Sequence, residues 1–128
     1  MPELKKYKMF IDGEWVDSES KKTFETLNPE NNEPWAVAPE ASAKDVDRAV
    51  KAAQKAFEGE WPKLLPRDRA KFLRAIADQL RKNAEMLGEI ETIDTGKLFR
   101  ETKQQAIYIA EYYDYYAGLA DKVEGTVL

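Results

Sequence analysis

The sequence of 128 residues contains no cysteine and no histidine. These absences exclude disulfides, thiolate nucleophiles, zinc sites built on cysteine or histidine, and any Ser-His-Asp triad within the chain. Long apolar runs are also missing, since no segment approaches the ~18 residues of a membrane span. The opening MPELKKYKMF holds no apolar core of a signal peptide, so the expected compartment is the cytoplasm.

The chain also lacks an excess of positive charge. The chain has 20 Lys and Arg against 24 Asp and Glu, for a formal net charge of −4. This balance, without a basic amphipathic face, argues against nucleic-acid and membrane-surface binding. Hydrophobic residues make up 43% and aromatic residues 11% of the chain, which indicates one ordinary folded domain rather than disorder.

Short apolar stretches separated by turn residues predict a β arm over about residues 7–40. Asp12-Gly13 between two apolar runs is a strong hairpin signal. A further turn at Asn28–Asn32, where Pro presets φ and Asn tolerates the left-handed region, separates two more strands. The four expected strands are 9–11, 15–16, 23–27 and 35–38.

Helical periodicity replaces this pattern over residues 42–122 and predicts four helices. Ser42 and Asp45 resemble a capping box, and Gly59 ends the first apolar stripe. Pro66 suits the first turn of the second helix, and Asn83 is expected to cap the third. The fold class is therefore mostly α with an N-terminal β arm. The expected apolar positions of the first two helices are Val46, Ala49, Val50, Ala53 and Phe57, then Ala70, Leu73, Ile76, Ala77 and Leu80.

The last helix, from about Phe99 to Lys122, contains a tyrosine cluster. An apolar stripe predicts that Tyr113 and Tyr116 are buried, whereas Tyr112 and Tyr115 lie off it and indicate a contact with another domain or subunit. A base-stacking platform is the alternative, but acidic rather than basic residues surround the rings. The stripe consists of Phe99, Thr102, Ala106, Ile109, Tyr113, Tyr116 and Ala120.

The segment Asp94-Thr95-Gly96-Lys97 superficially resembles a phosphate-binding loop. The upstream glycine and the Ser or Thr after the lysine are missing, so a helix C-cap with Gly96 in the left-handed conformation is favoured. Asp94 stands at this helix end, where backbone carbonyls could join it around a hard cation. Acidic pairs such as Glu89 and Glu91 point to different helix faces and indicate solvated surface rather than an acid–base dyad.

The order of these segments resembles the N-terminal part of the NAD(P)-dependent aldehyde dehydrogenase family from about Lys8 onward. Two positions depart from the family pattern: Asn32 replaces the usual glycine, and Leu98 replaces a frequent proline. The matching segments are FIDGEW (10–15), ETLNPENNEP (25–34), AKDVDRAV (43–50) followed by Ala52-Ala53 and Ala56-Phe57, Trp61, Pro66, Arg69, ETIDTGK (91–97) and YYAGLADK (115–122).

The resemblance implies an α/β fold whose parallel sheet lies in downstream sequence, with residues 1–128 forming the N-terminal part of the cofactor-binding domain. In the family, a cysteine attacks the aldehyde to give a thiohemiacetal, hydride passes to NAD or NADP, and a Glu-activated water releases the acid. Those residues lie beyond this chain, so no catalytic or cofactor-binding residue is assigned here. The apolar ending Thr126–Leu128 fits a chain cut before a partner segment.

The resemblance implies one binding site in this chain, a site for a monovalent cation. Several relatives bind K⁺ or Na⁺ through positions that match Thr26, the carbonyl of Leu27, and Asp94. A further carbonyl would come from the absent region, so the site in this chain would be partial.

Two functions from different classes remain. The first is an N-terminal fragment of an aldehyde dehydrogenase, inactive alone, whose partner is the remainder of that chain or a second copy of itself. The alternative is a non-catalytic interaction module that binds a complementary chain or a full-length relative.

Overall fold

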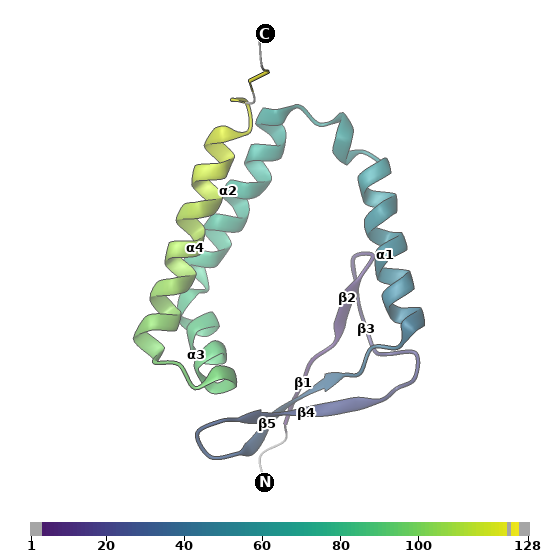
Figure 1. The fold of residues 1–128 in the computed structure, drawn as a ribbon, viewed down its shortest axis with the longest axis vertical. Helices are drawn as coiled ribbons and strands as arrows, with labels where there is room; N and C mark the ends of the chain where they lie inside the picture. Colours follow the sequence, from purple (N-terminus) through teal and green to yellow (C-terminus); the bar gives the residue numbers. More distant parts are fainter. Residues whose placement is uncertain (1–3, 123, 126–128) are drawn as a thin grey trace. The chain divides into compact units, whose positions relative to one another are not determined.

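The computed structural model describes residues 4–122, 124 and 125 (Figure 1). Its elements are five short strands, a 3-10 turn and four α-helices, which confirms a mostly helical fold with an N-terminal β arm. The chain forms two compact units, one ending at Lys63 and the other beginning at Leu64, and each is described by itself. The apolar ending at 126–128 lies outside the described residues.

A tight hairpin opens the first unit and confirms the Asp-Gly signal. Strands β2 (Met9–Ile11) and β3 (Glu14–Val16) are antiparallel and joined by Asp12 and Gly13. The φ angles of these two residues are 53° and 83°, the double left-handed conformation of a type I′ turn, whose twist matches that of the strands.

The longer strands β4 (Thr23–Asn28) and β5 (Glu33–Pro39) are antiparallel neighbours, as the sequence predicts. Asn32 in their turn has φ 58°, a conformation that Asn tolerates in place of glycine. Strand β1 (Lys5–Lys6) pairs in parallel with β5 and completes a sheet ordered β1-β5-β4. This strand was not predicted, because two exposed lysines show no strand periodicity.

Helix α1 (Ala43–Glu58) begins with the predicted capping box, and Gly59 ends it. A 3-10 turn, η1 (Trp61–Lys63), follows. The apolar stripe on α1 exists as predicted, but the first unit leaves most of it uncovered. The exposed fractions of Val50 and Phe57 are 61% and 66%.

The second unit contains α2 (Pro66–Lys82), α3 (Ala84–Thr95) and α4 (Phe99–Leu119). Pro66 starts α2 and Gly96, with φ 73°, ends α3, as predicted. Asn83 occupies the N-cap position of α3, as predicted, but its side chain does not make the capping hydrogen bond. Its side-chain amide donates to the carbonyl of Gln79 at 2.8 Å, which satisfies the end of α2, and makes no cap for α3.

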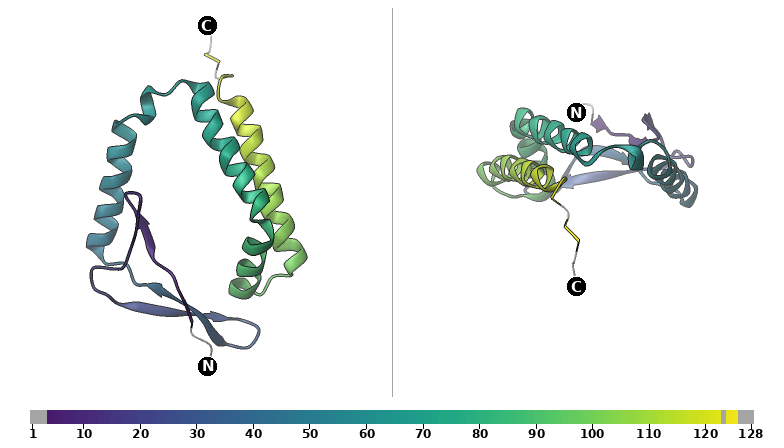
Figure 2. Two further views of the ribbon diagram at one scale, coloured as in Figure 1. Left: turned by 180° about the vertical axis from the view of Figure 1, so that it is seen from behind. Right: turned by 90° about the horizontal axis from the view of Figure 1, so that it is seen from above.

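Helix α4 runs antiparallel beside α2 and packs against α3 (Figure 1 and Figure 2, left). Small side chains make this close packing possible, since the buried positions of α4 are Thr102, Ala106, Ala110 and Ala117. The predicted burial of Thr102 and Ala106 is confirmed, but further along α4 the buried positions are Ala110 and Ala117. Tyr116 is 58% exposed rather than buried. The prediction followed the helical spacing of apolar and aromatic residues, whereas closely packed helices favour alanine between them.

Within the described residues, no helix is both long enough and apolar enough to cross a membrane.

Candidate functional site

Thr26 and Leu27 lie where the β4–β5 ladder is irregular. Thr26 pairs with Ala36 and Leu27 with Pro34, so Trp35 is an extra residue on β5. A bulge of this kind interrupts the regular backbone pairing. The Trp35 ring packs edge-on against Tyr7 with centroids 6.1 Å apart, and its indole nitrogen is buried without a partner among the described residues.

Asp94 lies in the last turn of α3, within the second unit. The turn is closed by Thr95, whose hydroxyl donates to the carbonyl of Glu91 at 2.6 Å, and by Gly96, whose N–H donates to Thr92 at 2.9 Å. Thr26 and Leu27 belong to the first unit, so the grouping of these residues with Asp94 stays a prediction. Over residues 4–122, 124 and 125, no group of three or more acidic side chains lies close enough to hold a metal ion.

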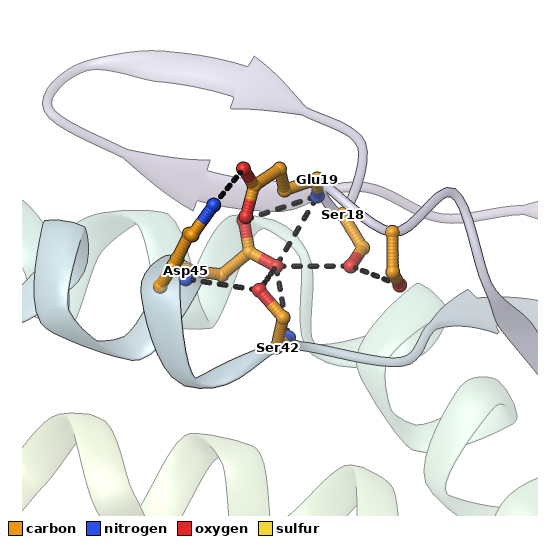
Figure 3. A network of polar contacts seen from close by, with 6 residues as sticks. Ser18, Glu19, Ser42 and Asp45 are labelled. Atoms are coloured by element: carbon orange, nitrogen blue, oxygen red, sulfur yellow. Dashed lines mark hydrogen bonds and ion pairs between the residues drawn. The ribbon is translucent and has the colours of Figure 1, made fainter.

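The densest polar cluster centres on the carboxylate of Asp45, at the start of α1 (Figure 3). The backbone N–H and the hydroxyl of Ser42 each donate to it at 2.8 Å. Ser18, far away in sequence, donates its hydroxyl at 2.9 Å, and the N–H of Glu19 lies 3.2 Å from both carboxylate oxygens. The side chain therefore ties the loop after β3 to the first turn of α1.

These donors lower the pKa of Asp45 from 3.8 to about 2, chiefly through the N–H and hydroxyl of Ser42, with Ser18 and Glu19 adding to the effect against the opposing influence of burial. A carboxylate that accepts this many hydrogen bonds is a poor proton acceptor. The cluster is consequently a structural anchor rather than an acid–base site. The capping box was readable from the sequence, but the Ser18 contact was not, because nothing local links residues 27 positions apart.

The tyrosine cluster of α4 forms an exposed aromatic surface on the second unit. Tyr108 and Tyr112 form an edge-to-face pair with centroids 5.0 Å apart and hydroxyl oxygens 3.0 Å apart. Tyr115 and Tyr116 form a second such pair at 5.4 Å. The hydrogen bond to Tyr108 raises the pKa of the Tyr112 phenol. Tyr112 and Tyr115 are exposed, as expected for residues off the buried stripe.

The sequence of this chain is similar to those of known dehydrogenases. The sequence profile of the aldehyde dehydrogenase family matches residues 15–128. The chain is 44% identical, over 98% of its length, to (Z)-2-((N-methylformamido)methylene)-5-hydroxybutyrolactone dehydrogenase of Acinetobacter baylyi, and covers 25% of that protein. It is 40% identical over 94% of its length to betaine aldehyde dehydrogenase of Bacillus subtilis, again covering 25% of the relative.

Solved structures agree with the sequence relatives. An NAD-dependent aldehyde dehydrogenase from Sinorhizobium meliloti superposes with a TM-score of 0.91 at 34% identity, over 96% of this chain and 25% of that one. Betaine aldehyde dehydrogenase of Staphylococcus aureus in complex with NAD⁺ gives 0.89 at 41% identity, over 94% and 24%.

The structure of this chain therefore matches part of the fold of known oxidoreductases. The chain belongs to the aldehyde dehydrogenase family and corresponds to its N-terminal segment. It spans about a quarter of the length of the curated relatives it matches.

Proposed function

We propose that this chain is the N-terminal part of the cofactor-binding domain of an NAD(P)-dependent aldehyde dehydrogenase and has no dehydrogenase activity by itself. The observation that supports this most strongly is the match of 96% of the chain to only 25% of a solved NAD-dependent relative, with a TM-score of 0.91. The rest of such an enzyme would supply the nucleophile, the general base and the cofactor contacts.

The residues of this chain do not fit a dinucleotide site. Its six glycines, at positions 13, 59, 88, 96, 118 and 125, are too far apart to form the Gly-rich turn that approaches a pyrophosphate. No step of hydride transfer is therefore assigned to them. The residues of this chain would instead pack against the rest of the cofactor-binding domain and complete it.

Exposed apolar side chains support this packing role. The open groove beside α2 and α3 is lined by Phe72, Ile76 and Met86, whose exposed fractions are between 42% and 53%. Val50 and Phe57 give α1 a second uncovered apolar face. Apolar surface of this extent favours burial against another protein segment.

Activity assays test the proposal directly. The purified chain should not reduce NAD⁺ or NADP⁺ with any aldehyde, and adding the complementary three-quarters of a family member should produce aldehyde-dependent NADH. The complementary part alone is the control. Cofactor reduction by this chain alone would overturn the proposed inactivity, and failure of the mixture to exceed the complementary part alone would contradict the packing role.

A monovalent cation is a second element of the proposal. The oxygens of Thr26 and Asp94 and the carbonyl of Leu27 are donors of the type that hard cations prefer, and we propose that they contribute part of a K⁺ or Na⁺ site once the remaining sequence is present. In the complemented protein, KCl should raise the melting temperature relative to N-methylglucamine chloride, and Asp94→Ala should remove that difference. An unchanged salt response in the variant would contradict the assignment.

The uncovered apolar faces also favour the alternative of a non-catalytic module that binds a complementary chain or a full-length relative. Size-exclusion chromatography with light scattering and a thermal melt separate the two functions. A self-sufficient module should be monomeric and melt cooperatively, whereas a segment that needs the rest of its domain should associate or melt broadly.

A further inference from the structure

A small hollow lies in the first unit, where the loop between β3 and β4 meets the end of β5. Its volume is about 360 Å³. Three lysines line it: Lys6 comes from β1, and Lys21 and Lys22 come from the loop. Tyr7 and Val37 also line it, and the Tyr7 N–H donates to the carbonyl of Val37 at 2.9 Å. The hollow therefore combines positive charge with apolar surface.

The backbone conformation of Lys21 explains why two consecutive lysines line the same hollow. Along an extended chain, neighbouring side chains point to opposite faces. Lys21 instead has φ 55°, in the left-handed region that lysine rarely adopts. This conformation breaks the alternation, so that both Lys21 and Lys22 line the hollow in spite of the repulsion between their charges.

The positive charges of the loop are not neutralised by neighbouring carboxylates. Among the residues that the structure describes, neither Lys21 nor Lys22 forms an ion pair. Asp17 contributes an acidic side chain to the border of the hollow, but the ammonium group of Lys8 already lies 3.8 Å from its carboxylate. The hollow therefore has an excess of positive charge that an anion would compensate.

Hydrogen bonds hold the backbone of this loop in place on both sides of the lysines. The Ser18 hydroxyl donates to the Asp45 carboxylate at 2.9 Å (Figure 3), and the Lys21 N–H donates to the carbonyl of Ser18 at 2.9 Å. Beyond the turn, the carbonyl of Lys22 accepts from the N–H of Glu40 at 2.9 Å. A ligand would not have to order this backbone, which lowers the entropic cost of binding.

We propose that Lys6, Lys21 and Lys22 form a binding site for a doubly charged phosphate group, either inorganic phosphate or a small phosphate monoester. Lysine binds phosphate as a compact point charge, without the fixed planar geometry by which arginine pairs with a carboxylate. The volume of the hollow leaves room for an organic group beside the phosphate, against Tyr7 and Val37. The site belongs to the first unit alone and does not depend on whether the chain takes part in catalysis.

Titration of the 128-residue chain with sodium phosphate and with phenyl phosphate, followed by ¹H–¹⁵N NMR at about pH 8, tests the site, since both probes are then largely doubly charged. Sodium chloride at equal ionic strength is the reference, because it reproduces the screening without the phosphate oxygens. Saturable shifts should concentrate at residues 6–7 and 18–23. Tighter binding of phenyl phosphate would identify a monoester as the ligand, and equal affinities would identify inorganic phosphate. Shifts without saturation, or shifts spread over both units, would overturn the proposal.

Variants that remove one charge separate a defined site from general attraction of anions. Lys22→Gln should weaken phosphate binding about three- to tenfold, because a charge-assisted hydrogen bond is lost. Lys82→Gln is the matched control and should leave the affinity unchanged. Lys82 is an exposed lysine of the second unit and forms no ion pair within the described part of the chain. An equal loss of affinity in the two variants would contradict the site.

Substitutions at Lys21 separate binding from folding. Glycine adopts the left-handed conformation freely but has no ammonium group. Lys21→Gly should therefore unfold at the same urea concentration as the wild type or a higher one, by tryptophan fluorescence, yet bind phosphate about three- to tenfold more weakly. Lys21→Arg keeps the positive charge and should retain most of the binding. Wild-type affinity in Lys21→Gly would overturn the assignment of this lysine to a phosphate site.

Discussion

Gly88 on α3 lies directly against the backbone of Lys103 on α4. A Cβ atom added at Gly88 would be 2.8 Å from the Lys103 nitrogen and 2.9 Å from its Cα. Atoms at those distances overlap, and backbone atoms of a packed helix cannot move aside cheaply. The absence of a side chain at Gly88 therefore sets how closely α3 and α4 approach.

Gly88→Ala should destabilise the second unit by about 1–3 kcal/mol, because the added methyl group must push the two helices apart. Urea unfolding followed by far-UV circular dichroism measures the change. Gly118→Ala is the matched control, since a Cβ there would meet no atom within 4 Å, and it should be neutral or stabilising by about 0.4–1 kcal/mol. Equal stability of the two variants would contradict the close approach.

Thr102→Val should also destabilise the second unit, by about 1–3 kcal/mol. The Thr102 hydroxyl is fully buried and lies 2.9 Å from the carbonyl of Gly88, 3.0 Å from that of Phe99 and 2.9 Å from the hydroxyl of Thr92. Valine keeps the shape but leaves the half-buried Thr92 hydroxyl and the buried carbonyl of Gly88 without this partner. The same denaturation experiment applies, and Thr95→Val, at an exposed position, should cost less. A larger cost at Thr95 would contradict the assignment.

Ser42→Ala should weaken the first turn of α1 by about 1 kcal/mol, the usual cost of losing an N-cap hydroxyl. All three tryptophans, Trp15, Trp35 and Trp61, belong to the first unit, so their fluorescence during urea unfolding reports on it. The matched control is Ser20→Ala, because Ser20 makes no hydrogen bond to α1. A loss of equal size in both variants would indicate a general effect of the substitution.

The stability of the first unit should fall as the pH drops from about 4 to about 2. The pKa of Asp45 is lowered in the folded chain from 3.8 to about 2, so the unfolded chain takes up the proton first on acidification. The resulting stabilisation is fully present above pH 4 and is lost as the pH falls through the folded value. Tryptophan-detected unfolding midpoints across this range measure the loss.

Asp45→Asn provides the control for this titration. The variant should be less stable than the wild type at neutral pH, and the difference should shrink towards pH 2, where the wild-type carboxylate is protonated. A difference that stays constant across the range would show that the Asp45 charge does not contribute.

Local signals predicted much of this architecture because each depends on a few neighbouring residues. Gly13 and Asn32 occupy left-handed turn positions, Ser42 and Asp45 form the capping box, and Gly96 ends α3. In each case the conformational preference of the residue is satisfied by atoms within a few positions along the chain. The sequence alone therefore predicted both the positions of these turns and caps and the residues that form them.

Features that depend on distant contacts were not predictable in the same way. The parallel pairing of Lys5 and Lys6 with β5 has no local pattern, and the bulge at Trp35 arises from a register between two strands. The buried face of α4 was predicted correctly at Thr102 and Ala106 but misplaced further along the helix, because it depends on how closely α2 and α3 approach. The grouping of Thr26 with Asp94 rests on family resemblance alone.

The Ser18–Asp45 hydrogen bond has a consequence for where the chain tolerates changes in length. The residues between its two ends include the whole β4–β5 hairpin, whose strands return the chain towards its starting point. Extra residues placed at the tip of that hairpin, between Asn28 and Glu33, would lengthen the hairpin without changing the distance between Ser18 and Asp45. An insertion of one residue between Glu40 and Ser42 would instead move the start of α1 away from Ser18. The tip is thus a permissive site for peptide tags, and the short connection before α1 is not.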